Sequence, residues 1–227
     1  MSDTMSTAGD AELRARILGS VAAEPSPTRG QRRRRDLLLF AGAAAVAVAV
    51  FALFGGVRPY TRPLSLLLGT AAGTALLAAV GLALAFGRGR SMVGRSRQVL
   101  FATLASLPFA LLAWKAGVSA FYEGMSVPWP GRPGYRCLAL SLAVGLTPLL
   151  AALAARRKSD PVHPGTTGAA IGAACGLAAA ALVDLWCPVA HLPHLLLGHL
   201  LPIALLALAG AAAGSRLLAL RFQTRAP

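Results

Sequence analysis

Six long, nearly uncharged stretches recur along the chain. They cover approximately residues 37–55, 64–86, 98–119, 137–155, 167–186 and 199–215. Each is close to the length of about 20 residues that a helix needs to cross about 30 Å of hydrocarbon. None shows the strict alternation of barrel strands, and a lipid-exposed helix satisfies its own backbone hydrogen bonds. The pattern therefore predicts an all-α fold, a polytopic membrane bundle of six transmembrane helices within residues 37–219.

Residues 1–36 have a different pattern, because they are mostly polar and contain no apolar run typical of a signal peptide. Within them, Leu13, Ile17 and Val21 recur every four residues and predict a short amphipathic helix, which the prolines from Pro25 onward end. So short a segment has no core of its own. Its apolar stripe would dock on a partner protein or lie on the inner leaflet of the membrane lipid.

Composition and charge support this topology. The chain has 227 residues, of which 56% are hydrophobic and 13% charged, and its net charge is +14. The basic residues gather before the first stretch, in alternate loops and in the terminal segment 220–227. By the positive-inside rule, the protein is expected in a bacterial inner membrane with both termini on the cytoplasmic side. The charge is thus explained by topology and attraction to anionic lipid, and we expect no direct nucleic-acid binding.

Cysteine and histidine residues gather at the opposite, outer side of the predicted bundle. Cys137 opens the fourth stretch and Cys187 closes the fifth, so an antiparallel helical hairpin places both thiols at one end. His191, His194 and His199 follow closely. These residues could form a disulfide, a metal site or another sensor of redox state or acid. Alternatively, the histidines only hydrogen-bond at the membrane interface, since their spacing matches no established zinc signature.

Several of these features together resemble the NrsF-type membrane anti-sigma factors. The resemblance rests on the segments from Leu13 to Leu18 and from Ala23 to Arg29, the arginine run that follows, the six stretches, and the two cysteines with Cys187-Pro188. It implies a cytoplasmic N-terminus that binds an extracytoplasmic-function sigma factor, and two cysteines toward the periplasm. The residues expected to contact the sigma factor are Leu13, Arg14, Arg16, Ile17, Val21, Pro25, Ser26, Pro27, Thr28 and Arg29.

The predicted function is therefore negative regulation of transcription by a membrane-bound anti-sigma factor. A periplasmic or membrane stimulus such as light, singlet oxygen, redox change or metal would release the sigma factor. No catalytic elbow, phosphate loop or paired carboxylates appear, so we expect neither enzyme activity nor a cofactor. The alternative is a small metal or solute transporter that uses the outer cysteines and histidines. Glycines four residues apart predict close packing within the bundle, with a homodimer as a second possibility; they are Gly69, Gly73, Gly168, Gly172, Gly176, Gly210 and Gly214.

Overall fold

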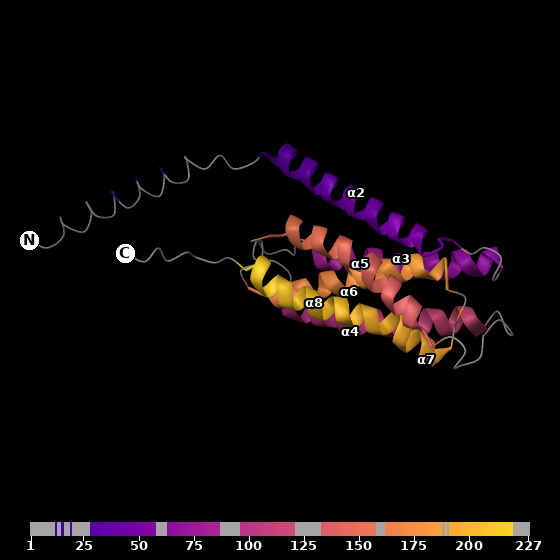
Figure 1. Ribbon diagram of the computed structural model, residues 1–227. Coiled ribbons are helices and arrows are strands. Elements are labelled where there is room, and N and C mark those ends of the chain that lie inside the picture. The colour runs from indigo at the N-terminus through magenta and orange to yellow at the C-terminus, as the bar shows by residue number, and fades with distance from the viewer. Residues whose placement is uncertain are drawn as a thin grey trace, which may run out of the picture. The chain divides into compact units, whose positions relative to one another are not determined.

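A computed structural model of the chain describes residues 12, 15, 19, 28–57, 63–86, 96–120, 133–157, 162–187, 189 and 191–219. Its main elements follow one another in chain order: α2 (Arg29–Leu53), α3 (Leu64–Phe86), α4 (Arg97–Ala120), α5 (Tyr135–Ala155), α6 (Pro164–Asp184), α7 (Leu192–Leu195), the π-helix η2 (Leu196–Leu200) and α8 (Leu201–Leu217). The chain divides into two compact units, Met1–Leu38 and Leu39–Pro227. The second contains the helical bundle shown in Figure 1.

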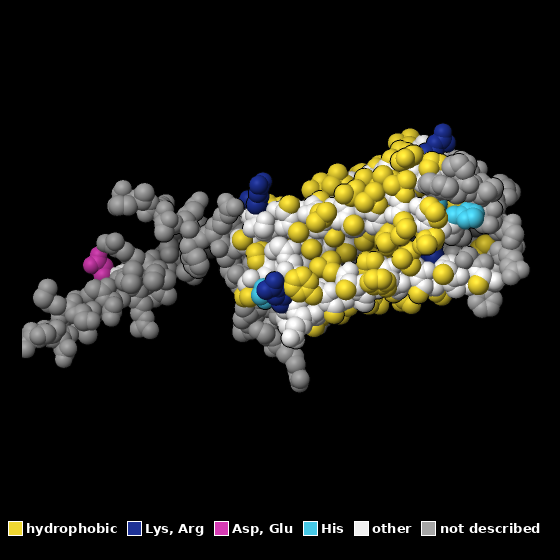
Figure 2. Space-filling model, turned by 90° about the horizontal axis from the view of Figure 1, so that it is seen from below, with side chains coloured by type: hydrophobic (Ala, Val, Ile, Leu, Met, Phe, Trp, Pro, Cys, Tyr) yellow, Lys and Arg dark blue, Asp and Glu magenta, His cyan; other side chains and the backbone are white. Residues whose placement is uncertain are grey.

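The described residues contain six helices that are long and apolar enough to cross a membrane, and no strand. The prediction of an all-α bundle with six spanning helices is therefore confirmed. Large hydrophobic side chains in the middle of these helices face outward, including Leu76, Phe109, Leu150 and Leu208. Hydrophobic side chains cover much of the bundle face in Figure 2, as expected where helices meet lipid tails.

Two helix starts differ from those predicted. The first helix begins at Arg29, eight residues before the predicted residue 37, because Thr28 caps it. The Thr28 N–H donates to the side-chain oxygen of Gln31 (3.0 Å), and the Gln31 N–H donates to the Thr28 hydroxyl (3.3 Å). This reciprocal pair is a capping box, which satisfies two amide groups at a helix start. The last spanning segment begins at Leu192 rather than residue 199, because α7 and η2 run directly into α8.

Helix α6 forms the centre of the bundle, and most of its residues are buried. It packs against α3, α4, α5 and α8. Its contact with α8 is made by glycines: a Cβ atom at Gly172 would collide with the Leu206 carbonyl, and one at Gly168 with the Gly210 carbonyl. The predicted packing role is thus confirmed for these glycines. At Gly69, by contrast, an added Cβ meets nothing within 4 Å.

Candidate functional site

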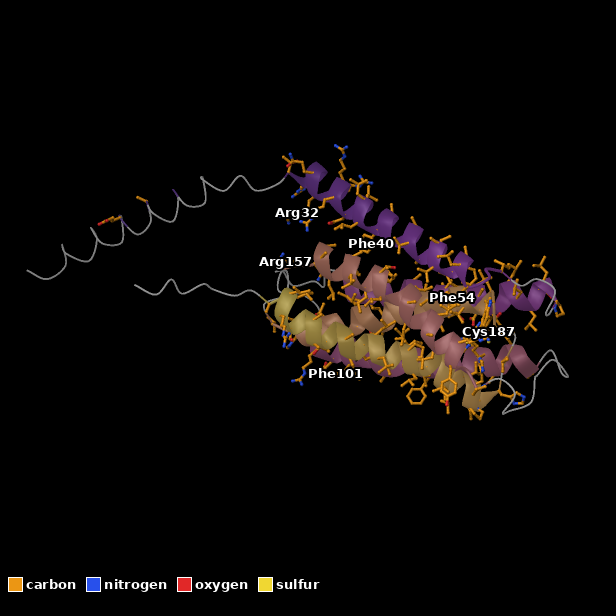
Figure 3. All side chains as sticks on the ribbon, in the orientation of Figure 1. Arg32, Phe40, Phe54, Phe101, Arg157 and Cys187 are labelled. Atoms are coloured by element: carbon orange, nitrogen blue, oxygen red, sulfur yellow. The ribbon has the colours of Figure 1, made fainter. Side chains whose placement is uncertain are left out.

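Two cysteines and two histidines meet in a buried cluster at one end of the bundle. Cys137 lies in the first turn of α5, Cys187 follows the end of α6, His194 belongs to α7 and His199 to η2. All four of these elements start or end at the same end of the bundle. Figure 3 shows Cys187 there, and Arg157, which follows α5, at the other end. We call Cys137, Cys187, His194 and His199 the Cys/His cluster.

The π-helix brings the two histidines together. In an α-helix, residues five positions apart point about 140° away from each other, because each residue turns the helix by about 100°. A π turn bonds residue i to residue i+5, so positions five apart come to lie on one face. Consistent with this geometry, the ring centroids of His194 and His199 are 5.6 Å apart.

Glycines allow α5 to approach this π turn. Gly134, which precedes α5, has φ 105°, a left-handed conformation that favours glycine. A Cβ at Gly134 would lie 3.2 Å from the Gly198 nitrogen. A Cβ at Gly198 would lie 3.0 Å from the Cβ of Cys137. Side chains at these two positions would therefore push Cys137 away from the histidines.

The cluster is compact and buried. One sulfur or nitrogen atom from each of its four side chains lies within 4.8 Å of the others. The Nε2 atom of His194 is 3.1 Å from the Cys187 sulfur and 3.5 Å from the Cys137 sulfur. Both cysteines are free thiols, and the four residues are between 1% and 4% exposed. Val144, Ala179, Val183 and Val189 pack around the cysteines.

The electrostatics of the cluster favour a thiolate at one position. Cys187 lies in the loop after α6, where its N–H donates to the Val183 carbonyl (2.8 Å). The neighbouring Cys137 thiol acts as a hydrogen-bond donor and holds the pKa of Cys187 well below its ordinary value, despite the opposing effect of burial. A thiolate is the form of cysteine that binds metal and reacts with oxidants.

A second layer of polar residues lies next to His199 of the cluster. Asp184 forms a salt bridge with Lys115 through its Oδ1 atom and accepts a hydrogen bond from the Thr74 hydroxyl at Oδ2 (2.7 Å). The same Oδ1 atom is 3.7 Å from Nδ1 of His199. Lys115, Asp184 and Thr74 are all buried. The layer thus joins the cluster to α3, α4 and α6.

The structure separates the predicted site residues into four groups: the Cys/His cluster, His191, the start of α2, and residues outside those that it describes. It brings Cys137, Cys187, His194 and His199 together, whereas His191 precedes α7 and is not among the four. Thr28 and Arg29 lie at the start of α2. Leu13, Arg14, Arg16, Ile17, Val21, Pro25, Ser26 and Pro27 lie outside the described residues.

Sequence reasoning missed two features of the site. One is the Lys115–Asp184 pair, because no pattern in the sequence shows that α4 and α6 bring these two residues together. For the role of Thr28 a signal was present: Thr28-Arg29-Gly30-Gln31 has the T-x-x-Q spacing of a capping box.

Comparison with known protein families gives a match over most of the chain. The family model described as "Negative regulator of sigma F", NrsF, matches residues 20–220. No curated protein and no solved structure matches the chain significantly. The family match covers most of the chain, including all six candidate spans and the whole Cys/His cluster. The chain therefore belongs to the NrsF family of negative regulators of a sigma factor.

Proposed function

We propose that this protein holds an extracytoplasmic-function sigma factor at the inner membrane and releases it when a stimulus acts on the Cys/His cluster. The observation that carries the proposal is the family match over residues 20–220, on a chain with six helices able to span a membrane. A negative regulator built mainly of such helices can silence its partner by keeping it at the membrane.

The distribution of charge supports cytoplasmic termini. Arg97, Arg156 and Arg216 lie at the end of the bundle where α4 starts and where α5 and α8 end. There Arg156 donates a hydrogen bond to the Phe86 carbonyl, at the end of α3 (3.2 Å). Positive side chains favour the cytoplasmic side, so the Cys/His cluster at the other end faces the periplasm in this proposal.

In this proposal the N-terminal segment binds the sigma factor. Its stripe of Leu13, Ile17 and Val21, flanked by Arg14 and Arg16, would lie in a groove of the sigma factor that RNA polymerase also needs. The family match begins at residue 20, so it includes the segment from Pro25 to Arg29 but not the start of the stripe. A hundredfold loss of affinity on stimulation requires about 2.8 kcal/mol. A single ligand that favours one packing of the bundle can supply that difference.

Capture of the sigma factor from membranes tests the proposal. The full chain is expressed with the sigma factor encoded beside its gene and purified from membranes in mild detergent. The wild-type chain should retain the sigma factor, and the double variant Arg16→Glu, Ile17→Asp should lose it. A matched control, Ala15→Asp with Arg225→Glu, introduces the same charges. It places the new aspartate about 160° from Ile17 around the helix, so it should retain the partner.

Two results would contradict the proposal. Capture that survives the Arg16→Glu, Ile17→Asp change would exclude the stripe as the binding segment. Reporter fusions that place the N-terminus in the periplasm would exclude sequestration altogether, because the sigma factor acts in the cytoplasm.

A transporter is the second candidate, and the buried Lys115–Asp184 pair is the observation that favours it. Ionisable side chains inside a membrane bundle often mark the path of an ion or solute. Uptake of Zn²⁺ or Cd²⁺ into vesicles that contain the purified chain would support this candidate. An anti-sigma factor should give the same flux as empty vesicles.

A further inference from the structure

We propose that the Cys/His cluster is a site for one thiophilic divalent cation of the Zn²⁺ and Cd²⁺ class, bound tetrahedrally by Cys137, Cys187, His194 and His199. This inference names the ligand of the Cys/His cluster. It rests on the proposed function only in one respect, namely that binding of the cation would release the sigma factor. The site itself is argued from the geometry of the four side chains and of Asp184.

The spacing of the donor atoms fits a tetrahedral ion. With Zn–S bonds of about 2.3 Å and Zn–N bonds of about 2.05 Å, sulfur and nitrogen on one ion are about 3.5 Å apart. The two sulfur-to-nitrogen distances at His194 are 3.5 Å and 3.1 Å. All four donors lie within 4.8 Å of one another, so small side-chain movements complete the tetrahedron.

Charge and burial also fit such an ion. Binding converts both thiols to thiolates, and their protons leave to solvent. Two thiolates and two neutral imidazoles around a divalent cation then have no net charge, which suits a site whose residues are at most 4% exposed. A mixed sulfur and nitrogen donor set favours Zn²⁺ and its heavier relatives over Mg²⁺ or Ca²⁺, which prefer oxygen.

Asp184 has the position of the outer partner of a metal-bound histidine. Such a histidine usually donates its second ring N–H to a carboxylate, which fixes the ring and its tautomer. Nδ1 of His199 is 3.7 Å from Oδ1 of Asp184, which leaves Nε2 for the cation. Among the described residues, neither ring nitrogen of His199 has a hydrogen-bond partner, although both are buried. A bound cation would satisfy Nε2.

A disulfide between Cys137 and Cys187 explains less of the arrangement. It would use both sulfurs and leave the two buried imidazoles with no role. It also gives no reason for a π turn that places His194 and His199 on one face, or for a carboxylate beside His199. A cation site accounts for all of these features together.

Cobalt titration tests the inference, since Co²⁺ reports its own ligands. The reduced full chain, in detergent, is titrated with Co²⁺ under anaerobic conditions. We expect one ion per chain, a thiolate-to-cobalt charge-transfer band and the strong visible absorption of tetrahedral Co²⁺. Zn²⁺ should displace the Co²⁺, as the usual order of affinities requires.

Variants identify the ligands. Cys187→Ser should lower the charge-transfer band to about half or less, because one of the two thiolate ligands is lost. Cys175→Ser and His191→Ala should leave it unchanged, because Cys175 and His191 are not in the group of four. His199→Cys adds a third thiolate and should raise the band about 1.5-fold, since Cys₃His sites also bind tetrahedrally. This gain of signal keeps the test decisive if Cys187→Ser proves poorly folded.

Three results would overturn the inference. They are a wild-type chain that binds no Co²⁺, a band of undiminished intensity in Cys187→Ser, and a non-reduced chain whose mass and thiol count show a Cys137–Cys187 disulfide as the native state. The capture assay reports separately on the proposed function. Sigma-factor capture without Co²⁺ binding removes the cation site alone, and Co²⁺ binding without capture removes the anti-sigma proposal alone.

Discussion

Lys115 of α4 and Asp184 of α6 form a salt bridge inside the bundle, where their side chains are 8% and 1% exposed. Breaking a buried pair on one side leaves the remaining charge uncompensated, which typically costs about 3–5 kcal/mol. We therefore expect Asp184→Leu to destabilise the folded bundle by this amount. The free energy of unfolding, measured by titrating the chain from mild detergent into dodecyl sulfate, gives the comparison.

The double variant Asp184→Leu, Lys115→Met is the control for this prediction. It removes both charges and keeps apolar volume, so it should recover most of the lost stability. If the single and double variants are equally unstable, the loss comes from packing at position 184 and not from the unpaired lysine.

The glycine contact between α6 and α8 predicts a strong effect of one methyl group. An alanine at Gly172 would collide with the Leu206 carbonyl, which belongs to the backbone and has no side-chain freedom to move aside. Overpacking of this kind costs about 1–3 kcal/mol. Gly172→Ala should lower the free energy of unfolding accordingly. In the control Gly69→Ala the new methyl group meets open space, and alanine favours the helix by about 1 kcal/mol. Equal stability of the two variants would contradict the close contact.

Thr28 has a structural role as the cap of α2, in addition to the sigma-binding role predicted for it. Thr28→Ala should cost about 0.5–2 kcal/mol at the helix start, whereas Thr28→Ser should keep the capping box. Hydrogen exchange of the amides of residues 29–32 measures the effect directly. If Thr28→Ser exchanges as slowly as the wild-type chain but does not capture the sigma factor, then Thr28 contacts the partner as well as capping the helix.

The bundle was predictable from the sequence, because length and hydropathy decide which segments can span a membrane. The starts of its first and last helices were not, since a helix continues through polar residues once they are capped or buried. Arg32 to Arg35 lie within α2, and His194 and His199 lie within the last spanning segment. A search for uncharged stretches places Arg32 to Arg35 and His194 outside the helices, and His199 only at the first position of the last one.

The Cys/His cluster was predictable only in part. The hairpin topology places Cys137 and Cys187 at one end, but three histidines follow and their spacing does not show which of them turn inward. The π turn determines which histidines join the cluster, because it aligns His194 with His199. No pattern of residues in the sequence predicts this turn. The partnership of Asp184 with Lys115 depends on the packing of α4 against α6, a tertiary contact without a local signal.

The backbone contact between α6 and α8 has a mechanical consequence. Two helices whose glycines interlock along their length cannot slide past each other without first separating, so they move together as one stiff body. Asp184 ends one of these helices, and His199 lies in the π turn that leads into the other. We therefore expect a shift of either residue to be carried over the roughly 30 Å length of α6, with no flexible relay between its two ends.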